Sequence, residues 1–277
     1  MRYCIQTSRK LVVTIICCLL PILGGCSHKN VSFLKTSNRF ELPETNGYRL
    51  NGGHTMALQY QNAGASRLEF SSEPDFEPLA TDKPTVYDNH RSNAIKPSYA
   101  VNERLDVALR ISQDESGYAL PPAVGGGVKY QFTGASQTHA KAGNRAMALS
   151  ANISYAMDKT AKQHAGVDEY HYDLAIVTND IALIFGYRLI DNLQVYGGPF
   201  VIHHYYNSRS TLSDASGTVI DKQNKFGSAY VGGLNLGLAN NFTATWMLMG
   251  EVAFSRLHWK QTNENSAQFG ITLQKRL

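Results

Sequence analysis

Apolar and polar residues alternate along most of the chain, from about residue 49 to the C-terminus. The clearest example is residues 99–112, where every second position is apolar: Leu105, Val107, Leu109 and Ile111. A period of two residues is typical of a β-strand whose two faces differ in chemistry. Repetition of this pattern between turn residues predicts an all-β protein with about ten strands, at 49–60, 65–72, 99–112, 126–134, 144–157, 169–189, 193–206, 225–239, 242–259 and 266–277.

The links between these strands favour an antiparallel, up-and-down barrel. The links at 190–192 and 239–241 are tight, and the link at 135–143 is of intermediate length. Longer links lie at 113–125, 158–168 and 207–224. Short links that alternate with long ones are the arrangement of periplasmic turns and external loops in outer-membrane barrels. The link 73–98 does not fit, because it is long and falls on the side of the short turns. If the first two strands lie outside the barrel, eight strands remain.

Two predicted strands have an irregular apolar phase. In 169–189, Leu174 and Ile176 share one phase and Phe185 shares the other. A period of two cannot change phase without an irregularity, so we expect a bulge or turn at 177–180. In 193–206 the outward-facing set is expected to be Tyr196, Phe200 and Ile202. Aromatic residues near strand ends suit interfacial belts, namely Tyr130, Tyr155, Tyr187, Tyr196 and Trp259.

The alternation alone leaves the direction of the apolar face open. In a soluble sandwich or a lipocalin-like barrel it points inward, whereas in a membrane barrel it faces lipid and the polar phase fills the lumen. The polar phase of this chain combines small and charged residues, which suits a narrow polar interior and favours a transmembrane β-barrel. We expect Glu251 to pair with a basic residue across that interior. The expected lumen network consists of Arg104, Asp106, Arg110, Lys129, Arg188 and Glu251.

The N-terminus has the features of a secretory signal peptide. A basic start is followed by an apolar run that ends in Leu23-Gly24-Gly25-Cys26. The run of about 16 residues is shorter than the ~20 that a spanning helix needs. Residues 1–25 are therefore predicted to be cleaved, residues 26–47 to form the new N-terminus and a polar tether, and residues 48–277 to form the barrel.

The net charge and the positions of the cysteines argue against some kinds of binding site. The formal charge is +4 at pH 7, but Arg2, Arg9 and Lys10 precede Cys26 and no acidic residue does. The mature charge of about +1 gives no support for nucleic-acid binding. All cysteines lie at or before Cys26. The mature fold is therefore expected to have no disulfide and no thiolate metal site.

The four residues Leu23-Gly24-Gly25-Cys26 resemble the lipobox of bacterial lipoproteins. In that family the cysteine carries lipid, palmitate among its acyl groups, and becomes the N-terminus after cleavage. The resemblance implies that Cys26 is the acylation site. Ser27 stands where an Asp would imply retention at the inner membrane, so the resemblance implies transfer to the outer membrane by the lipoprotein-sorting machinery.

Residues 48–277 resemble the small outer-membrane β-barrel families of the OmpA-like and OmpW-like kind. The resemblance implies a lipid-anchored protein of the bacterial outer membrane that contacts outer-membrane lipids and the barrel-assembly machinery. Residues 269–277 look like the terminal strand of such barrels, but they end in Leu277 instead of an aromatic residue.

Residues suited to catalysis or metal binding do not form a convincing group. His203 and His204 are neighbours in a strand and face opposite sides, which argues against a two-histidine metal site. Ser255 and His258 lie on opposite phases, whereas a hydrolase needs its nucleophile beside a base. No catalytic residue, metal site or cofactor is predicted.

Three functions remain open. The first is a non-enzymatic outer-membrane barrel with a structural or surface-interaction role, or a narrow channel. The second is a lipid-remodelling enzyme in the same membrane. The third is a lipid-tethered periplasmic barrel that binds a ligand, which requires the apolar phase to point inward.

Overall fold

The computed structural model describes residues 30–35, 38–47, 54–71, 85–114, 122–163, 169–214, 216–259 and 262–277. The predicted signal peptide at 1–25 and the predicted acylation site, Cys26, lie outside the described residues.

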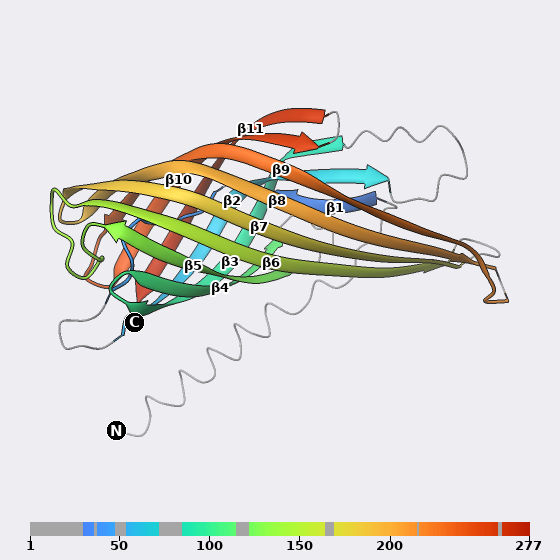
Figure 1. The fold of residues 1–277 in the computed structure, drawn as a ribbon, viewed down its shortest axis with the longest axis horizontal. Helices are drawn as coiled ribbons and strands as arrows, with labels where there is room; N and C mark the ends of the chain where they lie inside the picture. Colours follow the sequence, from blue (N-terminus) through green and yellow to red (C-terminus); the bar gives the residue numbers. More distant parts are fainter. Residues whose placement is uncertain are drawn as a thin grey trace, which may run out of the picture.

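Ten antiparallel strands form a closed barrel (Figure 1). Each strand from β2 to β11 pairs with the next, and β11 pairs back with β2, which confirms the predicted all-β, up-and-down barrel. An additional strand, β1 (Asn30–Lys35), pairs with β2. The barrel strands are β2 (Met56–Ser71), β3 (Thr85–Asn102), β4 (Leu105–Asp114), β5 (Ala123–Thr133), β6 (Arg145–Gln163), β7 (Glu169–Ile190), β8 (Leu193–Ser213), β9 (Val219–Asn241), β10 (Trp246–Trp259) and β11 (Thr262–Arg276).

The two ends of the barrel differ. We call one end the turn end: it holds the links 103–104, 134–144, 191–192 and 242–245 together with the C-terminus. We call the other the loop end: it holds the links that follow β2, β4, β6, β8 and β10. The two tightest links at the turn end, 103–104 and 191–192, are two-residue turns that continue the antiparallel pairing. No helix in the described residues is long and apolar enough to cross a bilayer.

The first hairpin of the barrel differs from the prediction. β2 spans both of the strands predicted at 49–60 and 65–72, and the strand predicted at 99–112 is the hairpin of β3 and β4. The first difference removes one strand and the second adds one, so the total of ten is unchanged. β3 lacks a clear alternation and contains Pro97, beside which its pairing with β4 is interrupted. Because much of 73–98 is strand, the remaining link lies at the loop end, and the misfit in the predicted topology disappears.

The inner face of β7 keeps one phase along the whole strand. β7 pairs with β6 in an unbroken register from Glu169 to Tyr187, so the bulge predicted at 177–180 is wrong. Leu174 and Ile176 are buried on the same face as Ala182. The apolar residues change from the inner face near the loop end to the outer face near the turn end, and the backbone register is unaffected.

The outward set predicted for β8 is also wrong. Tyr196, Phe200 and Ile202 are all buried inside the barrel. Gly237 and Gly233 of β9 lie directly opposite Tyr196 and Phe200. A Cβ atom at either glycine would overlap the facing ring. The aromatic rings fit inside because the positions opposite them carry no side chain.

Apolar side chains cover the outside of the barrel. Leu109 is 65% exposed and Leu236 is 64% exposed, whereas Asp106 and Glu251 are buried inside. This confirms the predicted direction of the apolar phase. Tyr130, Tyr155 and Tyr187 are exposed as predicted for the aromatic belts, but Tyr196 is not. The side chain of Trp259 is outside the described part of the structure.

Four strands extend past the barrel at the loop end. β7 has 22 residues and β9 has 23, whereas β5 has 11. The last pair between β9 and β10 is Tyr230 with His258, so β9 continues well beyond it. Figure 1 shows the ribbons of β6 to β9 running on together to one side. We call this part the loop-end sheet; it consists of residues 156–163, 169–176, 206–213 and 219–227.

Candidate functional site: a lumen filled by the N-terminal segment

A stretch of the chain before the first barrel strand lies inside the barrel. We call residues 38–46 the lumen segment. It differs from the predicted tether at 26–47, because a tether would leave its charged side chains in water. Here the barrel wall surrounds them, and every charged side chain of the segment has less than a tenth of its surface exposed. The buried charged residues are Arg39, Glu41 and Glu44.

Each charged residue of the lumen segment forms an ion pair with a wall strand, two of them with β7 and one with β3. Arg39 pairs with Asp180 of β7. Glu41 pairs with Lys96 of β3. Glu44 pairs with Arg188 near the turn end of β7. Such pairs offset the large cost of removing isolated charges from water. Segment and wall are thus electrostatically complementary along the lumen.

Glu251 of β10 holds the backbone of the segment. Its Oε1 accepts a hydrogen bond from the N–H of Arg39 at 2.6 Å, and its Oε2 accepts one from the N–H of Phe40 at 3.0 Å. Phe40 has a φ of 51°, which is unusual for a large residue. Consecutive N–H groups with a left-handed residue form a concave anion-binding nest. Glu251 was expected to face a basic side chain, and instead it binds these two backbone amides.

The end of the segment is fixed at the turn end of the barrel. The N–H of Thr45 donates to Oε1 of Gln131 at 2.7 Å, and the N–H of Asn46 donates to Asp106 at 2.9 Å. The link 134–144 folds over this point: the N–H of Gln137 donates to the carbonyl of Thr45 at 2.9 Å. The link is thus long enough to reach over the end of the segment and to cover it at the turn end.

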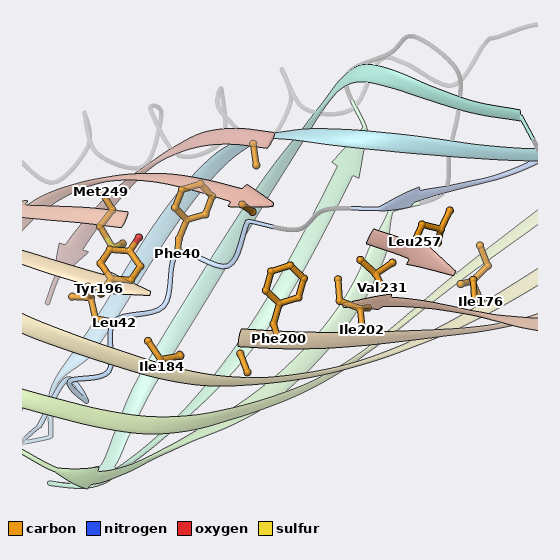
Figure 2. Packing of buried hydrophobic residues seen from close by; sticks show 14 of the residues in the cluster. Phe40, Leu42, Ile176, Ile184, Tyr196, Phe200, Ile202, Val231, Met249 and Leu257 are labelled. Carbon is orange, nitrogen blue, oxygen red and sulfur yellow. The ribbon is translucent and has the colours of Figure 1, made fainter. Parts of the chain in front are cut away.

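Apolar contacts accompany the polar ones. Phe40 is fully buried and occupies the space above Gly270, where a Cβ atom would overlap its ring. The guanidinium of Arg39 lies 4.5 Å from the centre of the Phe200 ring, a cation–π distance. Figure 2 shows Phe40 and Leu42 lying among side chains of the wall that include Tyr196. Inward-facing aromatic side chains of the wall thus pack against the segment.

Of the six residues predicted for the lumen network, Asp106, Arg188 and Glu251 are buried in the interior and Lys129 is half-buried there. Asp106 and Lys129 form an ion pair at 3.2 Å, and Lys129 also donates to the carbonyl of Glu44 at 2.9 Å. Arg188 and Glu251 bind the lumen segment as described above. Arg110 is half-buried on the inner phase of β4. Arg104 is exposed in the turn between β3 and β4 and does not line the lumen.

Sequence reasoning missed five members of this network. Lys96 was assigned to a link, and Asp180 was placed in a predicted bulge. The segment residues Arg39, Glu41 and Glu44 were assigned to a polar tether. One signal was present in the sequence: Phe40 and Leu42 alternate with these charges, which is unusual for a free polar linker.

One cavity between the described residues of the segment and the wall is small. A cavity of about 30 Å³ lies among polar groups that include Glu41, Lys96, Asp106 and Lys129. A volume of this size holds one or two water molecules and no larger ligand.

The histidines and serines of interest are separated. His204 is buried and its Nδ1 lies 2.9 Å from Oγ1 of Thr178, whereas His203 stacks on Tyr230 with ring centres 4.5 Å apart. The two histidines face opposite sides, as expected. Ser255 and His258 also lie on opposite faces of β10. Among the described residues, no group of three or more His, Cys, Asp or Glu side chains is arranged to hold a metal ion.

No protein-family model matches the chain, and no curated protein matches it. Among solved structures, the attachment invasion locus protein Ail of Yersinia pestis is 10% identical, with 81% of this chain and 97% of that chain covered and a TM-score of 0.26. Neisserial surface protein A is 11% identical, with 81% and 96% covered and a TM-score of 0.24. The outer membrane protease OmpT from Escherichia coli is 9% identical, with 80% and 93% covered and a TM-score of 0.32. At these values the assignment of the fold rests on the strand pairing of the chain itself.

Proposed function

We propose that this protein is an outer-membrane β-barrel lipoprotein whose lumen is closed by its own N-terminal segment. In this proposal it has a structural or surface-interaction role and neither conducts ions nor catalyses a reaction. The observation that carries the proposal is the set of ion pairs between the lumen segment and strands β3 and β7 of the wall, because they occupy the path that a solute would take.

The apolar outer surface supports a position in a membrane. On β7 the outward residues from Ile181 to Leu189 include Phe185 and Tyr187. A strand of this length, tilted by about 40°, covers roughly 20 Å, near the ~25 Å apolar band of outer-membrane barrels. An exposed apolar surface that encircles the molecule is far larger than soluble proteins show. This surface also gives the soluble, ligand-binding alternative less support.

The loop-end sheet supports a role at the surface. Long links of outer-membrane barrels face the cell exterior, and in this protein the strands themselves continue in that direction. The described exposed positions of the sheet carry charged residues, namely Asp173, Arg209 and Lys222, and apolar residues, namely Val219, Ile220 and Phe226. An extension of this kind suits contact with molecules outside the cell.

Conductance tests the closed lumen. We expect the purified wild-type barrel to leave a planar bilayer non-conducting. Replacing residues 38–46 by Gly and Ser at the same length should open steps of ion conductance, because the counter-charges and Phe40 are removed. The control replaces the exposed turn 242–245 in the same way and should stay closed. Heat-modifiable migration on a gel confirms that each variant is folded. Pore-like conductance of the wild type would overturn the proposal.

A lipid-remodelling enzyme is the second candidate, and the contact between Thr178 and His204 is the observation that favours it. A hydroxyl beside an imidazole is the start of a nucleophile and base pair. His204 is only 3% exposed, so a substrate would need an opening of the barrel to reach it. The candidate requires release of fatty acid from phospholipid vesicles by the wild type and its loss in Thr178→Ala. If the wild type releases none, the candidate is removed.

A further inference from the structure

The N-terminal part of the chain runs through the barrel in one direction. In β1, Asn30 lies opposite Ser71 and Lys35 lies opposite Ser66, so β1 starts at the loop end and runs inward. The lumen segment continues the same way, since Asn38 donates to the carbonyl of Glu251 and Asn46 reaches Asp106 at the turn end. β2 then begins at the turn end. The chain therefore enters from the loop-end side and leaves at the turn end.

The entry point is a seam in the wall between β2 and β11. β11 pairs with β2 only from Gly270 to Arg276, although β11 extends back to Thr262 alongside β10. β3 occupies the other side of β2 over nearly its whole length, so β1 lies on the β11 side, where the pairing between β2 and β11 has ended. The N-terminal chain thus joins the barrel at its wall, beside β2.

The seam lies at the loop-end border of the apolar surface. On β10 and β11, Phe254 and Phe269 are exposed apolar residues, whereas the outward positions nearer the loop end are polar: Arg256, His258, Asn263 and Asn265. β1 pairs with residues 66–71, which lie beyond that border. Asn30 therefore marks the membrane face on the loop-end side.

We propose that the mature chain begins at the cell-surface side of the outer membrane and that the acyl groups on Cys26 insert into the outer leaflet beside the seam. The inference rests on the proposed function, because it takes the barrel to span the outer membrane and Cys26 to be acylated. Cys26 precedes Asn30 by four residues, and a chain of that length spans at most about 14 Å. This is too short to reach the opposite face of the membrane.

The lumen segment keeps the anchor on this side. To bring the N-terminus to the turn end, the chain would have to withdraw Arg39, Glu41 and Glu44 from their partners in the wall. Removing one partner of a buried ion pair leaves a charge without compensation and is strongly unfavourable. The acyl anchor and the lumen segment therefore both require the N-terminus to lie on the loop-end side.

Epitope tags on intact bacteria test the position of the N-terminus. One variant carries a short tag after Lys29, a second carries it at Gly217 between β8 and β9, and a third carries it at Ala244 in a short turn. We expect antibody to reach the tags at Lys29 and Gly217 on intact cells, and to reach the tag at Ala244 only after the outer membrane is permeabilised. Heat-modifiable migration must show that all three variants are folded.

The three tags separate this inference from the proposed function. If Gly217 and Ala244 behave as expected but the tag at Lys29 requires permeabilisation, the inference is overturned and the barrel topology stands. If the tags at Gly217 and Ala244 exchange their behaviour, the orientation in the proposed function is wrong. Metabolic labelling with an alkyne analogue of palmitate should mark the wild type and not Cys26→Ser. A wild type without label overturns the anchor.

Discussion

At the scale of single residues, the stability of this protein depends on how its buried charged side chains are paired. Glu44 has no exposed surface, and its carboxylate contacts Arg188 and accepts a hydrogen bond from Asn144 at 2.6 Å. An ionised carboxylate without partners in such surroundings would cost several kcal/mol. The stability of the closed lumen therefore depends on individual partners in the wall.

Substitution of Arg188 tests this dependence. Arg188→Met leaves Glu44 without its counter-charge, and we expect the free energy of unfolding to fall by about 3–5 kcal/mol. Urea unfolding in lipid vesicles, followed by tryptophan fluorescence, measures the loss. The double variant Arg188→Met with Glu44→Leu removes both charges and should lose much less. Equal losses in the single and double variants would show that the pair does not hold the segment.

Glu251 binds backbone amides and not a counter-charge. Its substitution is therefore expected to lower the free energy of unfolding by a different amount from the substitution of Arg188. Glu251→Ala leaves the N–H groups of Arg39 and Phe40 without their acceptors. An unsatisfied buried donor costs about 1–3 kcal/mol, so we expect stability to fall by about 2–4 kcal/mol in the same measurement. Glu251→Gln keeps one acceptor and should lose roughly half as much. The exposed Glu264→Ala is the control, and a loss of the same size there would contradict this role.

At the scale of elements, β8 and β9 fit together through aromatic residues facing glycines. Tyr196 lies opposite Gly237, Phe200 opposite Gly233 and Tyr206 opposite Gly227. Each aromatic residue is buried inside the barrel. This arrangement allows large side chains to point inward in a narrow lumen, and it explains why their apolar character alone predicted the wrong face.

A methyl group at one of these glycines should disturb the fit. We expect Gly237→Ala to lower the free energy of unfolding by about 1–3 kcal/mol, the usual cost of overfilling a packed interior. The matched control is Gly250→Ala on β10, where a Cβ atom would meet nothing within 4 Å. Urea midpoints of the two variants give the comparison. A loss in Gly250→Ala as large as in Gly237→Ala would rule out the packing explanation.

The outer face of β4 is expected to contact lipid. Leu109→Arg places a charge in the apolar band, and we expect a loss of about 2–4 kcal/mol near the midplane of the bilayer. Ala142→Arg, in an exposed link at the turn end, is the control and should fold normally. Folding into vesicles at several urea concentrations provides the measurement. If Leu109→Arg folds as well as the control, Leu109 lies outside the membrane.

The sequence was sufficient to predict the elements with strong alternation. The exposed and buried phases of β4, β5, β6 and β11 follow directly from their period of two. β3 was missed because its polar sequence lacks that period. The lumen segment was missed for another reason: Glu44 and Arg188 are 144 residues apart, and Arg39 and Glu251 are 212 residues apart. Pairings at such separations arise only when the barrel closes.

At the scale of the whole molecule, the barrel and the loop-end sheet are made of the same strands. β6 to β9 contribute to both, so the extension needs no separate core and no hinge. In the loop-end sheet, residues 219–227 of β9 lie beyond the last pair with β10. Lys222 is exposed along this border, and charged residues at strand edges reduce unwanted pairing with other chains.

The position of the lumen segment also sets an order of assembly. Residues 38–46 are synthesised before every barrel strand, yet the wall around them is complete only when β11, the last strand, pairs with β2. In the lipoprotein proposed here, a bulky diacylated terminus could not pass through a finished lumen that already contains inward aromatic rings. The barrel must therefore be built around its own beginning, with the seam between β2 and β11 as the last part of the wall to form. Closure of the wall and enclosure of residues 38–46 are therefore the same step.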